Sequence, residues 1–139
     1  MYLLDTNVVS ESRKAGSGKA DDKVIAWLQS VAVASLFIPA ITVLELEIGV
    51  LRVERRDSAQ GELLRRWLDN QVLPTFADRI LAIGTVVARR CAQLHVPDPQ
   101  ADRDALIAAT ALVHGMTVVT RNVADFESTR VAVFNPWSG

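Results

Sequence analysis

Two acidic residues follow short apolar runs in the sequence, one directly and one after a short turn. Asp5 comes after residues 2–4, and Asp125 follows the β-branched run at 117–120 after one short turn. Short apolar runs of this kind predict buried parallel strands. Ligands of open parallel sheets bind beyond the carboxyl ends of the strands. We therefore expect Asp5 and Asp125 to lie at the same edge of one sheet.

Two further acids lie in predicted helices and have no basic partner along those helices. Asp104 opens a helix over residues 102–114, and the residues three, four and seven positions later are apolar, so its carboxylate shares the inward face. Glu45 lies in a helix over 40–56. Glu47 is a rival only two positions away, and the helical pattern does not exclude it.

Several carboxylates in one partly buried place repel each other and lose hydration, so they take up protons or bind cations. Oxygen ligands suit Mg²⁺, and Mn²⁺ can take the same site. The sequence has no cluster of histidine and cysteine that would indicate zinc. Each acid taken singly is also typical of a turn or a helix cap, so the hypothesis depends on the combination. The chemistry that follows is metal-dependent hydrolysis of a phosphodiester.

Strands that alternate with helices predict an α/β protein with a parallel sheet. Residues 13–22 are rich in glycine and charge and predict a mobile loop. The expected strands cover residues 2–4, 36–38, 80–83, 117–120 and 131–134, and the expected helices cover 24–34, 40–56, a segment around 63–68 ended by Pro74, 85–94 and 102–114. No repeat or composition shift divides the chain, which predicts a single domain over residues 1–139.

Composition limits the classes of function. The chain has 139 residues, half of them hydrophobic, and a net charge of -1 with an isoelectric point near 6.1, so bulk positive charge would not hold a nucleic acid. The sole cysteine, Cys91, lies in an apolar helical stretch and predicts core packing in a reducing compartment, which favours the cytoplasm. We expect neither a signal peptide nor a membrane span.

Two other classes with aspartates at strand ends fit poorly. A response-regulator receiver needs a late lysine, but no lysine follows Lys23. A haloacid-dehalogenase-type phosphatase needs an aspartate two positions after Asp5, where Asn7 stands.

Four short motifs, in order and at these separations, resemble those of a known family. They are LDTN at residues 4–7, TVLELEIG at 42–49, DALIAATA at 104–111 and TRNVADF at 120–126. The chain resembles PIN domains and, within them, the VapC and FitB-like toxins of type II toxin-antitoxin systems. The resemblance covers almost the whole length.

The resemblance implies a three-layer α/β/α fold with a central parallel sheet of four to five strands and an endoribonuclease activity that depends on Mg²⁺ or Mn²⁺. It implies that Asp5 and Asp104 are metal ligands and that Glu45 and Asp125 complete the site directly or through water. It also selects Glu45 over Glu47. Supporting residues implied by the resemblance are Thr6 and Asn122, which would orient the acids by hydrogen bonds.

The resemblance further implies an inhibitory VapB-type antitoxin, an RNA substrate and a homodimer or a larger toxin-antitoxin assembly. The loop at 13–22 and the cluster of Arg52, Arg55 and Arg56 are candidates for contact with RNA or antitoxin, although a solvated surface is the favoured interpretation. The alternative function is a PIN scaffold that binds a protein or RNA partner without catalysis. Such a module would bind its partner fully and cleave nothing.

Overall fold

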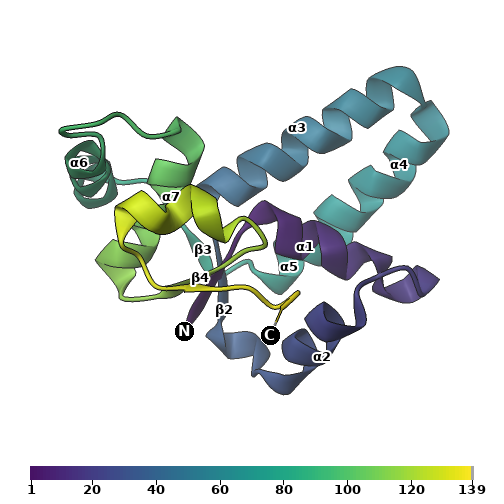
Figure 1. Ribbon diagram of the computed structural model, residues 1–139. Helices are drawn as coiled ribbons and strands as arrows, with labels where there is room; N and C mark the ends of the chain where they lie inside the picture. Colours follow the sequence, from purple (N-terminus) through teal and green to yellow (C-terminus); the bar gives the residue numbers. More distant parts are fainter. Residues whose placement is uncertain (139) are drawn as a thin grey trace.

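The computed structural model describes residues 1–138 and contains one sheet of five parallel strands in the order β3-β2-β1-β4-β5 (Figure 1). The predicted α/β class with a central parallel sheet is therefore confirmed. The strands are β1 (Tyr2–Leu4), β2 (Leu36–Pro39), β3 (Ile80–Leu81), β4 (Thr117–Val119) and β5 (Val133–Phe134).

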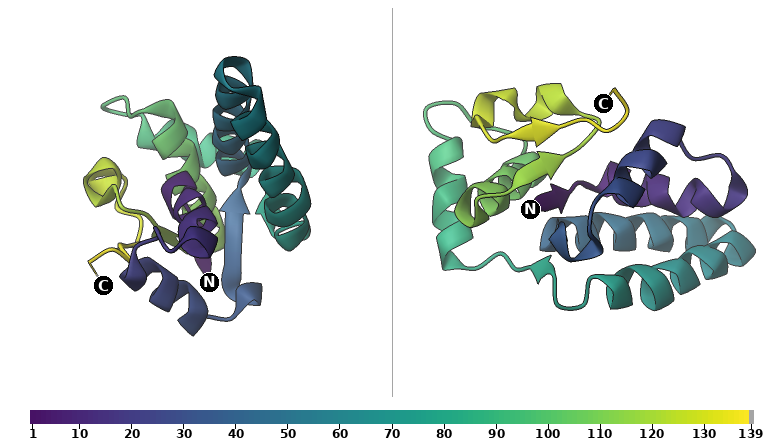
Figure 2. Two further views of the ribbon diagram at one scale, coloured as in Figure 1. Left: turned by 90° about the vertical axis from the view of Figure 1, so that its right-hand side faces the viewer. Right: turned by 90° about the horizontal axis from the view of Figure 1, so that it is seen from below.

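Helices connect these strands and cover both faces of the sheet (Figures 1 and 2). The α-helices are α1 (Thr6–Arg13), α2 (Asp22–Ser30), α3 (Ala40–Arg56), α4 (Ser58–Trp67), α5 (Leu73–Thr75), α6 (Thr85–Leu94) and α7 (Asp102–His114). Three 3₁₀ segments, η1 (Lys14–Ser17), η2 (Val33–Ser35) and η4 (Val123–Thr129), and the π-helical η3 (Leu68–Val72) complete the set. Over residues 1–138, none of the helices combines the length and hydrophobicity that crossing a bilayer requires.

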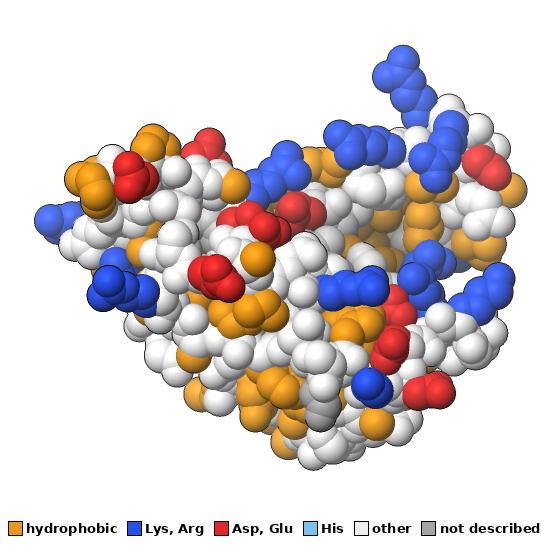
Figure 3. Space-filling model, viewed as in Figure 1, with side chains coloured by type: hydrophobic (Ala, Val, Ile, Leu, Met, Phe, Trp, Pro, Cys, Tyr) orange, Lys and Arg blue, Asp and Glu red, His pale blue; other side chains and the backbone are white. Residues whose placement is uncertain are grey.

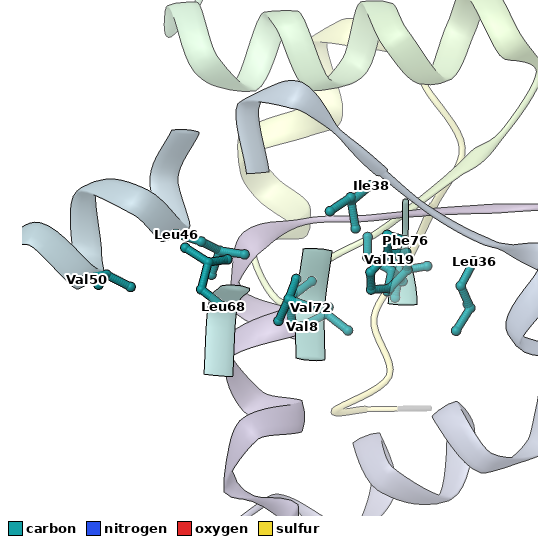
Figure 4. Close-up of a cluster of buried hydrophobic side chains, with 11 residues drawn as sticks. Val8, Leu36, Ile38, Leu46, Val50, Leu68, Val72, Phe76 and Val119 are labelled. Carbon is teal, nitrogen blue, oxygen red and sulfur yellow. The ribbon is translucent and has the colours of Figure 1, made fainter. Parts of the chain in front are cut away.

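Alternating side chains of the strands divide the core into two layers. Leu4 and Val119 pack on one face, in a cluster with Val8 of α1 and Leu46 of α3 that Figure 4 shows. Leu3 and Val118 point to the other face and pack against Ile107 and other residues of α7. Both faces of β1 and β4 are thus buried, which explains why these strands appear in the sequence as continuous apolar runs.

The segment at 13–22, expected to be a mobile loop, contains local structure. Arg13 ends α1, η1 follows, and Gly18 takes a left-handed conformation with φ 71° before Asp21 caps α2. The buried Glu11 carboxylate accepts hydrogen bonds from the Asp21 backbone N–H at 2.9 Å and from Lys14 Nζ at 3.1 Å. These bonds connect α1 to the start of α2, so the expectation of an irregular loop is wrong for the first part of the segment.

Several other expected boundaries also differ. The strands expected over 80–83 and 131–134 are shorter, at Ile80–Leu81 and Val133–Phe134. The helix expected to reach residue 34 ends at Ser30, because Val31 is extended. The helical stretch that Pro74 is expected to end continues through η3 into α5 and ends at Thr75, one residue after the proline. The expected end is therefore correct to within one residue.

Helices α3 and α4 form a hairpin that extends away from the sheet (Figure 2, right). Asp57 joins them and accepts a hydrogen bond from the Gln60 backbone N–H at 3.2 Å. The helices are in close contact at Gly61, where an added Cβ would lie 2.4 Å from the Cα of Glu54. Glycine is therefore required at this crossing. We call α3 and α4 the helical hairpin below.

Candidate active site

The strand order places the candidate site where the chain changes direction across the sheet. β1 pairs with β2 on one side and with β4 on the other, and such a switch point opens a crevice beyond the carboxyl ends of the strands. Asp5 follows β1, and Thr120 follows β4 beside it. Acidic side chains gather in the hollowed centre of the face shown in Figure 3, and basic side chains border them.

Asp5 is buried at this edge and is held by hydrogen bonds on both carboxylate oxygens. Its Oδ1 accepts from the Thr6 backbone N–H at 2.7 Å, which caps α1. Its Oδ2 accepts from Thr120 Oγ1 at 2.8 Å and from Asn7 Nδ2 at 3.4 Å. Burial raises the pKa of Asp5 above its ordinary value, these hydrogen bonds partly offset the rise, and the carboxylates of Glu45 and Asp125 add to it.

Glu45 reaches the same place from α3. Its Oε1 accepts a hydrogen bond from Thr6 Oγ1 at 2.7 Å, and its Oε2 lies 3.7 Å from Arg103 Nη1. The start of α3 is held against β1 by the buried Thr42 hydroxyl, which donates to the Leu4 carbonyl oxygen at 3.1 Å. The direction of Glu45 thus depends on contacts to both β1 and α1.

Asp104 lies in the first turn of α7, and Asp125 lies in the first turn of η4. Burial and, to a smaller extent, the neighbouring carboxylates of Asp125, Asp5 and Glu45 together raise the pKa of Asp104 to about 6. The structure therefore brings all four predicted acids into one electrostatic neighbourhood. We call Asp5, Glu45, Asp104 and Asp125 the acid pocket.

The polar residues around the pocket differ in part from the expected set. Thr6 bonds to two of the acids, through its backbone N–H and through its hydroxyl. Asn122 acts through its backbone N–H, which donates to Thr120 Oγ1 at 3.0 Å, so its contact with Asp5 is indirect. The sequence interpretation missed Thr120 and Asn7. The signal for Thr120 was its place directly after β4, because Leu4 pairs with Val119 and Asp5 must then lie beside Thr120.

Glu47, the rival of Glu45, points away from the pocket. Its carboxylate accepts two hydrogen bonds from Arg65 of α4, at 2.8 and 2.5 Å. These bonds lower the pKa of Glu47. Glu47 is thus a structural residue of the helical hairpin.

The donors of the acid pocket fit a hard divalent cation. They are carboxylate and hydroxyl oxygens, and the pKa of Asp104 is raised by burial and by neighbouring carboxylates, with no positive group offsetting the rise. Within residues 1–138, no three histidine, cysteine, aspartate or glutamate side chains are close enough to hold an ion by themselves. A Mg²⁺ site does not require three such side chains in contact with the ion, because Mg²⁺ keeps several waters and is usually bound through one or two carboxylates.

The chain is similar to proteins of known family over its full length. The model of the PIN domain matches residues 2–131. Toxin FitB of Neisseria gonorrhoeae is 39% identical over 143 residues, which cover 99% of each chain. The VapC ribonuclease Y4jK of Sinorhizobium fredii is 34% identical over 142 residues, covering 99% of this chain and 98% of that protein.

Solved structures agree with the sequence relatives. The structure of FitAB bound to the IR36 DNA fragment contains a chain that superimposes with a TM-score of 0.88 at 38% identity, covering 99% of this chain and 96% of that one. Homologues have thus been crystallised in toxin-antitoxin complexes, some of them bound to DNA. This chain belongs to the PIN-domain family and, within it, to the FitB-like VapC ribonuclease toxins of toxin-antitoxin systems.

Proposed function

We propose that this chain is a metal-dependent endoribonuclease toxin and that the acid pocket is its active site. The observation that carries the proposal is the meeting of four carboxylates with little opposing charge. Among residues 1–138, no lysine or arginine nitrogen lies within 4.0 Å of the carboxylates of Asp5, Asp104 or Asp125. Folding a protein around such a set is unfavourable unless a cation joins it, so the arrangement supports metal-dependent chemistry.

Mg²⁺ or Mn²⁺ would be held by Asp5 and Asp104, and Glu45 and Asp125 would complete the site directly or through water. When bound, the ion supplies an activated water and stabilises the negative charge that develops on the phosphate. The relative Y4jK is named a VapC ribonuclease, which supports RNA as the substrate.

The chain's own contribution is to hold these oxygens in position before substrate arrives. Asp5 is fixed by bonds from α1 and from Thr120, and Glu45 is oriented by Thr6. Asp104 lies on α7, which is packed against the sheet through Ile107. Ligands placed on rigid elements lose less freedom when the substrate complex forms, which favours catalysis.

The test is cleavage of a mixed pool of tRNA, rRNA and mRNA by antitoxin-free protein in Mg²⁺, Mn²⁺ or EDTA. We expect cutting in either metal, none in EDTA, and none by Asp5→Asn or Asp104→Asn. Asp98→Asn is the matched control, because Asp98 is exposed on the loop before α7. Loss of activity in the two pocket variants but not in the control supports the proposal. Absence of cleavage by folded, metal-loaded wild type would contradict it and favour a non-catalytic binding module.

We further propose that a VapB-type antitoxin docks in the hollow between α1 and the helical hairpin. The chain has an apolar hollow of about 680 Å³ bordered by α1, η1 and the helical hairpin, with Leu28, Leu63 and Trp67 among its lining residues. Leu63 is 57% exposed and lines this hollow, so its side chain is available for contact with a partner. The crystallised relative FitAB supports a partner of this kind.

A further inference from the structure

Arg103 stands beside the acid pocket and is the one exception to its lack of positive charge. It precedes Asp104 in the first turn of α7, and its Nη1 lies 3.7 Å from Glu45 Oε2. Among residues 1–138, no other lysine or arginine nitrogen comes within 4.0 Å of the four pocket carboxylates. Within residues 1–138, the Arg103 guanidinium is therefore the lysine or arginine group that comes closest to the pocket carboxylates, and it is well placed to act on a group that enters the pocket.

The pairing with Glu45 does not by itself account for this arginine. The separation of 3.7 Å exceeds the hydrogen-bond limit of 3.5 Å, and the Arg103 side chain is 53% exposed. A loose, solvated ion pair contributes little to stability. Glu45 also has a closer partner, because Thr6 Oγ1 donates to its other oxygen at 2.7 Å. Arg103 is thus free to exchange one oxyanion for another.

An RNA phosphate is the oxyanion that this position favours. The net charge of -1 means that the chain as a whole does not attract RNA, so a cation at the point of chemistry matters more. A guanidinium presents parallel N–H donors that match the oxygens of a phosphate. The carboxylates of the pocket would by themselves repel the phosphate, so a nearby cation favours its entry. We propose that Arg103 binds the non-bridging oxygens of the RNA phosphate that enters the acid pocket, leaving Glu45 as it does so. This inference rests on the proposed endoribonuclease function.

The test compares Arg103→Gln and Arg103→Lys with Arg89→Gln. Arg89 is an exposed arginine of α6, so its variant removes the same charge away from the pocket. The first readout is binding of a fluorescein-labelled single-stranded 12-mer RNA in EDTA over a series of salt concentrations. The second is kcat and KM for RNA cleavage in Mg²⁺, and the third is Mg²⁺ affinity of the protein alone.

We expect Arg103→Gln to bind the 12-mer more weakly than wild type does. The slope of log K against the logarithm of salt concentration should become shallower by about 0.7, the value for one phosphate contact on a single strand. We expect kcat/KM to fall about tenfold to a hundredfold, which corresponds to one charged hydrogen bond, mainly through KM. Arg103→Lys should retain the salt dependence and recover part of kcat/KM. Arg89→Gln should match wild type, and Mg²⁺ affinity should not fall in any variant.

Equal RNA binding and KM in Arg103→Gln and Arg89→Gln would overturn the proposal. A loss of Mg²⁺ affinity in Arg103→Gln without any change in RNA binding would overturn it as well, since the arginine would then act on the carboxylates alone. If wild type cleaves no RNA, the proposed function fails, but the binding series in EDTA still decides whether Arg103 contacts RNA.

Discussion

The acid pocket and the helical hairpin each bring several carboxylates together, and they neutralise them differently. In and beside the hairpin, Glu47 and Glu54 of α3 and Asp69 of η3 surround the guanidinium of Arg65, whose nitrogens approach them to 2.5, 3.2 and 3.6 Å. The hydrogen bonds from Arg65 lower the pKa of Glu47. In the pocket, the pKa values of Asp5 and Asp104 are raised instead.

This difference in opposing charge distinguishes acids that link helices from acids that are available to bind a ligand. In the first set, the guanidinium of Arg65 neutralises the carboxylates within the folded protein itself. The second set has only the loose approach of Arg103, so it remains able to take up a cation and a phosphate. Residue type alone does not distinguish the two sets, since both consist of aspartate and glutamate. The position of the opposing charge does.

The largest expected effect comes from exchanging Glu45 and Glu47 for glutamine in parallel. Glu45→Gln should lower RNA cleavage by about a hundredfold, because it removes a carboxylate that completes the proposed metal site directly or through water. Glu47→Gln should leave the activity of the folded protein within about twofold of wild type and lower Tm by about 1–3 °C, because it loses only a partly exposed ion pair. Initial cleavage rates and thermal melts check both. Similar losses of activity in the two variants would contradict the assignment of Glu45 to the active site and of Glu47 to the hairpin.

The hairpin crossing provides the next test. Gly61→Ala should destabilise the fold by about 1–3 kcal/mol, because its Cβ would overlap the Glu54 backbone. Gly49→Ala is the control, since no atom of another element lies within 4 Å of the place that its Cβ would take, and alanine there should stabilise α3 by up to about 1 kcal/mol. Urea unfolding measures both. A Gly61→Ala protein as stable as wild type would show that the helices do not cross this closely.

The apolar hollow tests whether the hairpin also binds a partner. Leu63→Glu should weaken antitoxin binding about tenfold or more, because it places a charge in an apolar interface. Val86→Glu is the control, since Val86 is 67% exposed on α6 and does not line the hollow. Calorimetric titration with a VapB-type antitoxin measures both, and thermal melts confirm folding. Equal affinities of the two variants would place the antitoxin elsewhere.

The smallest effect concerns stability and pH. The folded-state pKa of Asp104 is about 6, above its ordinary value of 3.8, so the folded state binds more protons between these values and stability falls as pH rises through them. Asp104→Asn should therefore raise the stability of metal-free protein at pH 7.5 by about 1 kcal/mol, because the carboxylate is partly solvated. The gain should vanish below about pH 4, where the wild-type carboxyl is protonated in both states.

Urea unfolding in EDTA at pH 4 and 7.5 measures this difference. Added Mg²⁺ should stabilise wild type more than Asp104→Asn, because an ion that binds only the folded state stabilises it by mass action. A variant less stable than wild type at pH 7.5 in EDTA would mean that Asp104 serves the fold rather than the site.

Local patterns in the sequence were sufficient for most of the elements. The apolar run at Tyr2–Leu4 and the helical period across Ala40–Arg56 depend on neighbours within one or two turns, and the structure contains both with the expected bounds. The segment at 13–22 was harder, because its order comes from the buried Glu11 carboxylate rather than from its own residues.

The sequence by itself determined the elements of a parallel α/β sheet and the positions of Asp5, Asp104 and Asp125 at the ends of elements, because strand ends and helix starts are local features. Only the tertiary structure decided which acids keep an opposing charge. Arg65 reaches Glu47 across the hairpin, Thr120 reaches Asp5 from 115 residues away, and Arg103 approaches Glu45 from another helix. Electrostatic partners are chosen by distance in space, and that distance exists only after the helices and the sheet have packed.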